Sequence, residues 1–155
     1  MNYRKSKIDG RMEVAVIAGS KSDQHILDEV CEVLKYFQVK YDAKILSAHR
    51  NHKELEDYIM NSKADLFIAI AGLSAHLPGF IASITTKPVI GVPVSSKLGG
   101  LDALLSIVQM PSKVPVACVG IDNGKNAALL AIEILSIKYL ELKEKLSKYR
   151  SGEIL

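Results

Sequence analysis

The 155-residue chain lacks the features of a nucleic-acid-binding protein. It has no tryptophan, only three phenylalanines and no long run of basic residues, and its 20 basic residues nearly balance 17 acidic ones. Nucleic-acid binders usually concentrate positive charge on one face and often stack bases on aromatic side chains. The sequence therefore argues against a nucleic-acid partner.

Cysteines and long apolar segments are also scarce. Cys31 and Cys118 both lie in apolar stretches, so we expect small buried thiols of a reducing compartment rather than a disulfide or a metal pair. No apolar run approaches the length that crosses a bilayer, and Met1 to Arg11 is too polar for a signal peptide. These absences predict a cytoplasmic protein with no membrane partner.

The length and composition favour a single domain. Hydrophobic residues make up 48% of the chain and charged residues 24%, which suits one substantial core, and 155 residues are too few for two comfortable domains. We expect a loose leader at residues 1–12, one domain at residues 13–150 and a short tail at residues 151–155.

Strand and helix patterns alternate along the chain. We predict five strands, at residues 13–18, 39–46, 66–71, 89–94 and 114–119. Helical patterns begin at Gln24, at Leu101 and at Ala127, and a further one follows a capping box of Asn51 with Glu54. The helix from Ala127 is expected to continue to about Arg150. Such alternation implies right-handed βαβ units. The expected fold is an α/β flavodoxin-like three-layer sandwich, with a parallel sheet of order 2-1-3-4-5 and a long C-terminal helix.

The two edges of this sheet differ in character. The strand at residues 39–46 alternates apolar and polar residues, as a half-exposed edge does, whereas the strand at residues 114–119 does not alternate. An apolar edge must be covered, and the helix from Ala127 to Ile137 is apolar almost all round. We therefore predict a homo-oligomer. The helix that begins at Leu101 is expected to bury one face of Leu101, Leu104, Leu105 and Val108.

A small polar loop, Gly19 to Asp23, joins the first strand to the first helix. The Ser20 and Ser22 hydroxyls and the free N–H groups at a helix start would suit a phosphate. The alternative is that Ser22 or Asp23 simply caps the helix. The loop has neither the dinucleotide glycine spacing nor that of a P-loop.

Two further polar loops follow the second and third strands, at residues 47–50 and 72–79. Ligands of open parallel sheets bind beyond the carboxyl ends of the strands, where these loops and the first loop converge. The residues predict a phosphate cradle made by Ser20, Ser22, Ser47 and Arg50, in which Arg50 supplies a cation. Asp23 offers a carboxylate for ribose hydroxyls, and His49 and His76 are the acid–base candidates. His25 and His52 are interpreted as surface residues.

Other chemistries lack their signatures. A phosphoacceptor receiver domain needs an acidic residue after the third strand, where the chain has Ile70-Ala71-Gly72. A serine hydrolase needs a Gly-x-Ser-x-Gly elbow, which does not occur. Zinc needs clustered ligands, and His49 and His76 are too few.

Five motifs together resemble the PurE family of purine biosynthesis: Gly19-Ser20-Lys21-Ser22-Asp23, Ser47-Ala48-His49-Arg50, Ala75-His76-Leu77-Pro78-Gly79, Ser106 to Pro111, and Asn126 to Leu130. The resemblance covers roughly Val14 to Tyr139. It implies a flavodoxin-like subunit, usually in an octamer, that forms 4-carboxy-5-aminoimidazole ribonucleotide from a small ribonucleotide without a metal or an organic cofactor.

The resemblance also implies residue roles. His49 would be the proton shuttle, and His76 would seat the carboxylate or carbon dioxide. Substrate binding would fall to Ser20, Ser22, Asp23, Ser47, Ala48, Arg50, Gly72 and Leu77, with the phosphate held by the three serines and Arg50 and the ribose by Asp23.

One motif departs from the family pattern. Bacterial mutases of the family usually read Gly-Gly-Ala-Ala-His, where this chain has Gly72-Leu73-Ser74-Ala75-His76. The direct carboxylases of the family replace the His-Leu-Pro region, so His76 and Arg50 place the chain with the mutases. We expect conversion of N5-carboxyaminoimidazole ribonucleotide by decarboxylation and recarboxylation. The alternatives are direct carboxylation of aminoimidazole ribonucleotide and a non-enzymatic nucleotide-binding α/β module.

Overall fold

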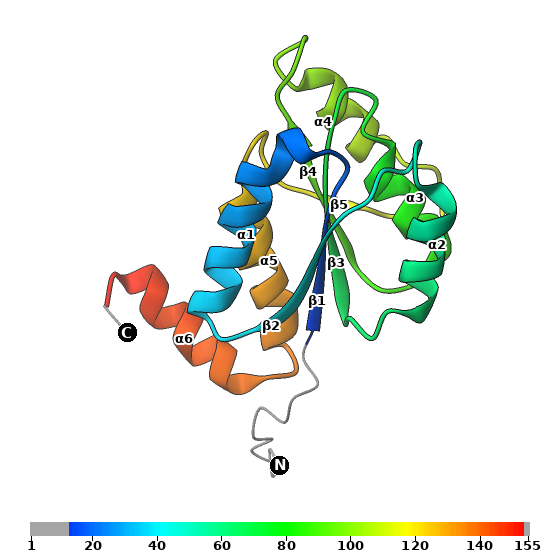
Figure 1. Cartoon of the computed structure of the whole chain (residues 1–155). Coiled ribbons are helices and arrows are strands. Elements are labelled where there is room, and N and C mark those ends of the chain that lie inside the picture. Colours follow the sequence, from blue (N-terminus) through cyan, green and yellow to red (C-terminus); the bar gives the residue numbers. More distant parts are fainter. Residues whose placement is uncertain (1–12, 154–155) are drawn as a thin grey trace.

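The computed structural model describes residues 13–153, so the expected leader at residues 1–12 and the last two residues of the tail lie outside it. Five parallel strands form one sheet of order β2-β1-β3-β4-β5, as predicted (Figure 1). The strands are β1 (Glu13–Ala18), β2 (Lys40–Ile45), β3 (Leu66–Gly72), β4 (Val89–Val94) and β5 (Ala117–Cys118).

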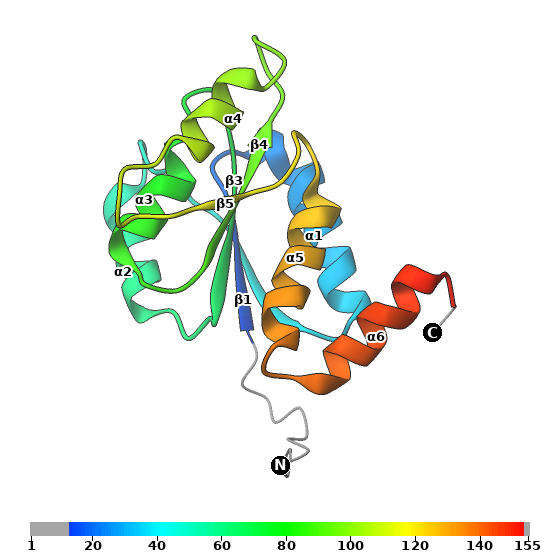
Figure 2. The same ribbon diagram turned by 180° about the vertical axis from the view of Figure 1, so that it is seen from behind.

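Helices cover both faces of this sheet, which gives the predicted flavodoxin-like three layers (Figures 1 and 2). One face carries α1 (Gln24–Tyr36) and α5 (Gly124–Ser136), and the other carries α2 (His52–Asn61), α3 (His76–Ile84) and α4 (Leu101–Val108). A 3-10 turn, η1 (Lys21–Asp23), precedes α1, and α6 (Leu140–Ser151) ends the described chain. None of the described helices is long and apolar enough to cross a bilayer.

Burial explains why the strands differ in sequence. Every residue of β4, and all but one residue of β1 and of β3, are buried, because helices cover both faces of these strands. The residues of β2 are exposed or half-buried, and the strand carries Lys40, Asp42 and Lys44. Charges on an edge strand hinder pairing with another sheet. The predicted edge position of β2 is confirmed.

The fifth strand is much shorter than predicted. We expected it to span residues 114–119, but only Ala117 and Cys118 pair with β4. Pro115 has no N–H to donate to a strand ladder, and so the apolar run contributes few backbone bonds before Ala117. The apolar edge that we expected is therefore only a two-residue strand.

The long C-terminal helix was also predicted wrongly, because a turn at residues 137–139 divides it into α5 and α6. The turn lets α6 fold back, so that Tyr139, Leu142 and Leu146 are buried in the same core as α1 and α5. Tyr149 makes edge contacts with Tyr36 and Phe37, at ring-centroid distances of 5.7 and 5.4 Å. The apolar faces of α5 are thus covered within the chain, so this helix gives no reason to expect a subunit partner.

The close approach of α1 and α5 depends on one glycine. A Cβ at Gly124 would lie 2.7 Å from the Ile26 backbone oxygen and 3.0 Å from its Cγ2. Because real Cβ atoms do not approach other atoms so closely, only glycine lets α5 start against α1 at this distance. The first turns of α1, which follow the loop after β1, are thereby held against the core.

Helix α4 faces the core with different residues from those predicted. Its buried residues are Ala103 and Ile107, and the Cγ2 atom of Ile107 occupies the space where a Cβ of Gly91 would lie. That contact orients the helix, and Leu101, Leu105 and Val108 of the expected core face point outward, whereas Leu104 is half-buried. Leu98, in the turn before the helix, is 69% exposed, and on the helix Leu101 is 54%, Leu105 46% and Val108 48% exposed. We call these four residues the α4 apolar stripe.

Candidate active site

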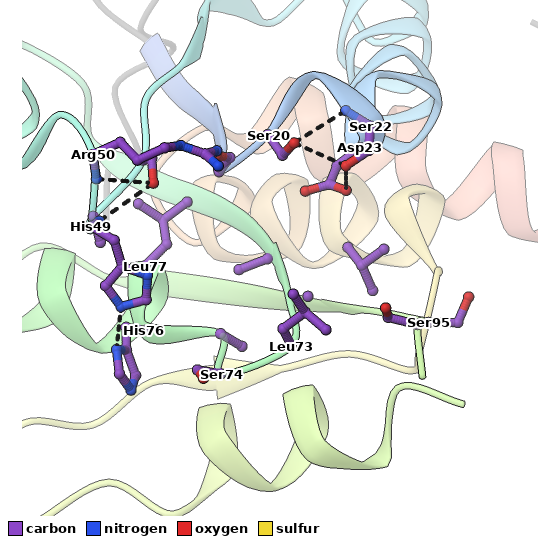
Figure 3. Close-up of a pocket in the computed structure, with 18 of the residues that line it drawn as sticks. Ser20, Ser22, Asp23, His49, Arg50, Leu73, Ser74, His76, Leu77 and Ser95 are labelled. Carbon is purple, nitrogen blue, oxygen red and sulfur yellow. Dashed lines mark hydrogen bonds between the residues drawn. The ribbon is translucent and has the colours of Figure 1, made fainter. Parts of the chain in front are cut away.

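A cavity of about 450 Å³ lies beyond the carboxyl ends of the strands, where the chain leaves β1, β2, β3 and β4 (Figure 3). Its lining includes all ten residues that the sequence indicated: Ser20, Ser22, Asp23, Ser47, Ala48, His49, Arg50, Gly72, His76 and Leu77. The structure therefore brings the three predicted loops together around one space.

The loop after β1 is organised by Ser20. Its Oγ atom accepts a hydrogen bond from the Ser22 N–H at 3.3 Å and lies 2.9 Å from the Ser22 hydroxyl. Ser20 thus caps the 3-10 turn, whereas Asp23 makes no side-chain capping bond and Ser22 lies inside the turn. The capping role considered for Ser22 or Asp23 is wrong. Asp23 is only 7% exposed, and its carboxylate accepts from the Ser22 hydroxyl at 2.8 Å.

The loop after β2 is organised in the same way by Ser47. This buried serine accepts hydrogen bonds from the N–H groups of His49 and Arg50, both at 3.3 Å. The predicted capping box is wrong, because Asn51 makes no side-chain capping bond at the start of α2. Arg50 reaches the first loop and donates to the Gly19 carbonyl at 3.0 Å. The two loops are therefore tied together by a cation beside Ser20 (Figure 3).

The two predicted histidines contact each other directly. Nε2 of His49 lies 2.5 Å from Nδ1 of His76, and the ring planes meet at 79°. Only one proton fits between two nitrogen atoms at this distance, so one ring donates to the other. His76 is the first residue of α3, which corrects our expectation that residues 76–79 belong to a loop. The pair can exchange a proton without water.

Three polar residues outside the three predicted loops also line the cavity. His25, which we interpreted as a surface residue, is exposed but borders the cavity, whereas His52 does not line it. Ser95 and Ser96 follow β4 and also line the cavity. The rule that ligands lie beyond the carboxyl ends of strands applies to this fourth loop too, so the two serines had a signal in the sequence.

Asp122 anchors the loop after β4, and no sequence pattern indicated it. Its Oδ1 atom accepts from the Ser95 N–H at 2.8 Å, and its own N–H donates to the Pro93 carbonyl at 2.9 Å. The residue has φ of 56°, in the left-handed region that aspartate tolerates better than most residues. The turn between β5 and α5 thereby holds a wall of the cavity.

The cysteines take no part in this site. Burial raises the pKa of both thiols, for Cys31 with a further contribution from Asp28, and neither residue lines the cavity. A raised pKa disfavours the nucleophilic thiolate. In the described part of the chain, no three histidine, cysteine or acidic side chains are placed to hold a metal ion together.

The comparisons with known proteins point to one family. The sequence model of a family described as AIR carboxylase matches residues 13–153. A Methanocaldococcus jannaschii protein named N5-carboxyaminoimidazole ribonucleotide mutase is 56% identical over 88% of this chain and 87% of its own length. A Pyrococcus abyssi protein of the same name is 55% identical over 91% and 83%. The crystal structure of Treponema denticola PurE superposes with a TM-score of 0.82 at 32% identity, covering 92% of this chain and 91% of that one.

The anchoring role of Asp122 can be tested by amide hydrogen exchange. Asp122→Gly tolerates the left-handed backbone but has no acceptor, and we expect the Ser95 amide to exchange at least about 10-fold faster, as for a lost bond to a charged group. Asp122→Asn keeps an acceptor oxygen and serves as the control, with partial protection. Equal exchange at Ser95 in all three proteins would contradict the anchor.

Proposed function

The chain belongs to the AIR carboxylase family, and from that premise we propose that it is the N5-carboxyaminoimidazole ribonucleotide mutase of de novo purine biosynthesis. The reaction moves a carboxylate from the exocyclic nitrogen to C4 of the ring. The observation that supports it best is the direct contact of His49 with His76 in the cavity that also holds Arg50 and the serine loops. The small-molecule substrate is a ribonucleotide.

We assign the phosphate to the loops after β1 and β2. Ser20, Ser22 and Ser47 supply hydroxyls there, and the bond to Gly19 uses one of the five N–H donors of Arg50. A guanidinium suits phosphate because its donors are forked and always charged. Asp23 would repel the phosphate and is assigned to the ribose hydroxyls. Ala48, Gly72 and Leu77 complete the substrate contacts.

We assign the proton transfers to His49. A carbamate releases carbon dioxide more readily when its charge leaves water, and the cavity offers apolar lining from Ala71, Leu77 and Val94. As the carbon–nitrogen bond breaks, the nitrogen takes a proton from His49. C4 of the ring then attacks the retained carbon dioxide, and His49 recovers the C4 proton. His49 thus gives up one proton and recovers one, and the scheme uses no metal or organic cofactor.

We give His76 two tasks. Its Nδ1 atom, in contact with His49, orients the shuttle ring and defines which of its nitrogens bears the proton. The remaining side of its ring faces the carboxylate or carbon dioxide.

We further propose a homo-oligomer, but on a different surface from the one that the sequence suggested. The α4 apolar stripe leaves four large side chains about half or more exposed, and Leu101, Leu105 and Val108 share one helix face because they are spaced by four and three residues. A second copy of the chain is the occupant that we assign to this stripe. The octamer follows from the family resemblance.

We assign residues 13–150 to one catalytic domain, and we assign the protein to the cytoplasm.

The reaction is tested by supplying each substrate to the purified protein. We expect faster product formation from N5-carboxyaminoimidazole ribonucleotide than from aminoimidazole ribonucleotide with bicarbonate. Efficient use of aminoimidazole ribonucleotide at low bicarbonate, with no faster use of the carbamate, would instead establish direct carboxylation. Tighter binding of AMP with no turnover of either substrate would indicate a nucleotide-binding module.

Two variants separate binding from chemistry. Arg50→Ala removes a charge-assisted bond and is expected to weaken aminoimidazole ribonucleotide binding by about 1.5–3 kcal/mol, or about 10- to 150-fold. His49→Asn should keep that affinity, measured by calorimetry, and lose roughly 10²–10⁴-fold in turnover rate, as for a positioned acid–base group. If Arg50→Ala binds like the wild type, or His49→Asn turns over normally, that residue's assignment is wrong.

The oligomer interface is tested by charge. Leu101→Glu with Leu105→Glu places two carboxylates in the α4 apolar stripe, and we expect an assembly smaller than that of the wild type by light scattering at micromolar concentration because unpaired buried charge is costly. Met60→Glu is the control, since Met60 is a 70% exposed apolar residue on α2, outside the stripe. A wild-type monomer, or an unchanged assembly in the double variant, would refute this interface.

A further inference from the structure

Leu73 adopts a backbone conformation that leucine normally avoids. It follows β3 directly and has φ of 55°, in the left-handed region where a Cβ crowds the neighbouring carbonyl. Glycine takes this conformation without that cost. A leucine at this position therefore lowers the stability of the fold.

Burial does not compensate for this strain. The side chain of Leu73 is 55% exposed, although it is large and apolar. Ala75, two residues later, also has positive φ, at 39°, but it is 4% exposed and packs in the core against the sheet. Strain at Ala75 is thus part of the packing, whereas strain at Leu73 needs another explanation. Backbone strain without a packing reason also occurs at surface turns, as at exposed Lys113, but it clusters at functional sites.

The position of Leu73 supplies that explanation. It lines the cavity, and because Gly72 is paired with Val94 in register, Leu73 and Ser95 leave neighbouring strand ends. Figure 3 shows Leu73 next to Ser74, on the side of the cavity away from Ser20 and Ser22. The half-exposed isobutyl group therefore stands at the cavity, where a bound ligand would cover it.

The chemistry of the proposed substrate identifies what Leu73 covers. A phosphate and a ribose need hydrogen-bonding partners, which Arg50, the serines and Asp23 provide, and an apolar side chain can offer them nothing. The flat aminoimidazole ring has faces that an alkyl group can cover. We propose that Leu73 is a specificity-determining residue that covers the ring of the bound substrate and keeps water from the carbon dioxide released beside it.

This inference rests on the proposed function and makes it more specific. After the carbon–nitrogen bond breaks, carbon dioxide has two fates. Either C4 attacks it and a carbon–carbon bond forms, or it escapes to become bicarbonate and leaves aminoimidazole ribonucleotide behind. A side chain that seals the ring face favours the first fate because it holds the reacting atoms together.

The experiment measures both stability and the fate of carbon dioxide. Leu73→Gly should raise the Tm by about 1–3 °C, because the strain is relieved. Leu73→Ala keeps the Cβ and should leave the Tm unchanged. Both variants should increase the fraction of substrate that ends as aminoimidazole ribonucleotide by about 5-fold, the effect expected from losing part of a leucine contact. Leu73→Met preserves the apolar volume and should keep the wild-type fraction.

A matched variant separates strain from sealing. Lys113 has φ of 77°, is exposed and does not line the cavity, so Lys113→Gly should also raise the Tm but leave the product ratio unchanged. If wild-type protein does not convert the carbamate, the proposed function fails. If wild type converts it and the Leu73→Ala and Leu73→Gly variants release no more aminoimidazole ribonucleotide, the role of Leu73 alone is wrong.

Discussion

The parallel pairing of β1 with both of its neighbours is the constraint on which the cavity depends. Ala18, the last residue of β1, is paired with Ile45 of β2 and with Ile70 of β3. Strands β1 and β2 therefore end at the same level and β3 continues for two more residues, to Gly72, so that their loops leave one edge of the sheet. A slip of one residue would reverse the faces of a strand and move its loop by more than 3 Å. The register thus sets the distances across the site.

Hydrogen bonds within the chain hold these loops before any ligand binds. Arg50 ties the second loop to the first, Ser47 satisfies two N–H groups of its own loop, and Asp122 holds the loop after β4. Two residues with positive φ, Leu73 and Ala75, bracket the loop after β3. A site organised in this way loses less conformational entropy on binding, so more of the contact energy is expressed as affinity and orientation.

The apolar surface of the helices is distributed unevenly. Helix α6 folds back across α1 and α5, and its buried leucines and aromatic contacts cover apolar surface of these two helices. No comparable element of residues 13–153 covers the outer face of α4, although Ile107 of the same helix packs tightly on Gly91. The surface proposed for a second copy therefore lies next to the β4 loop, which lines the cavity.

The pattern of apolar residues, read with the rules for parallel sheets, was enough to predict the strand order and to bring three polar loops to one cavity, because the carboxyl ends of parallel strands share one edge. Ala48, Gly72 and Leu77 were singled out within these loops only by the family resemblance. The pattern did not determine which neighbour each helix face meets. The outward stripe of α4 depends on the contact of Ile107 with Gly91, and the position of α6 depends on the burial of Leu142 and Leu146 in the core shared with α1 and α5. The His49–His76 contact and the Asp122–Ser95 bond join residues 27 positions apart. Periodicity describes one element at a time, so only the packed tertiary structure decides which side chains touch.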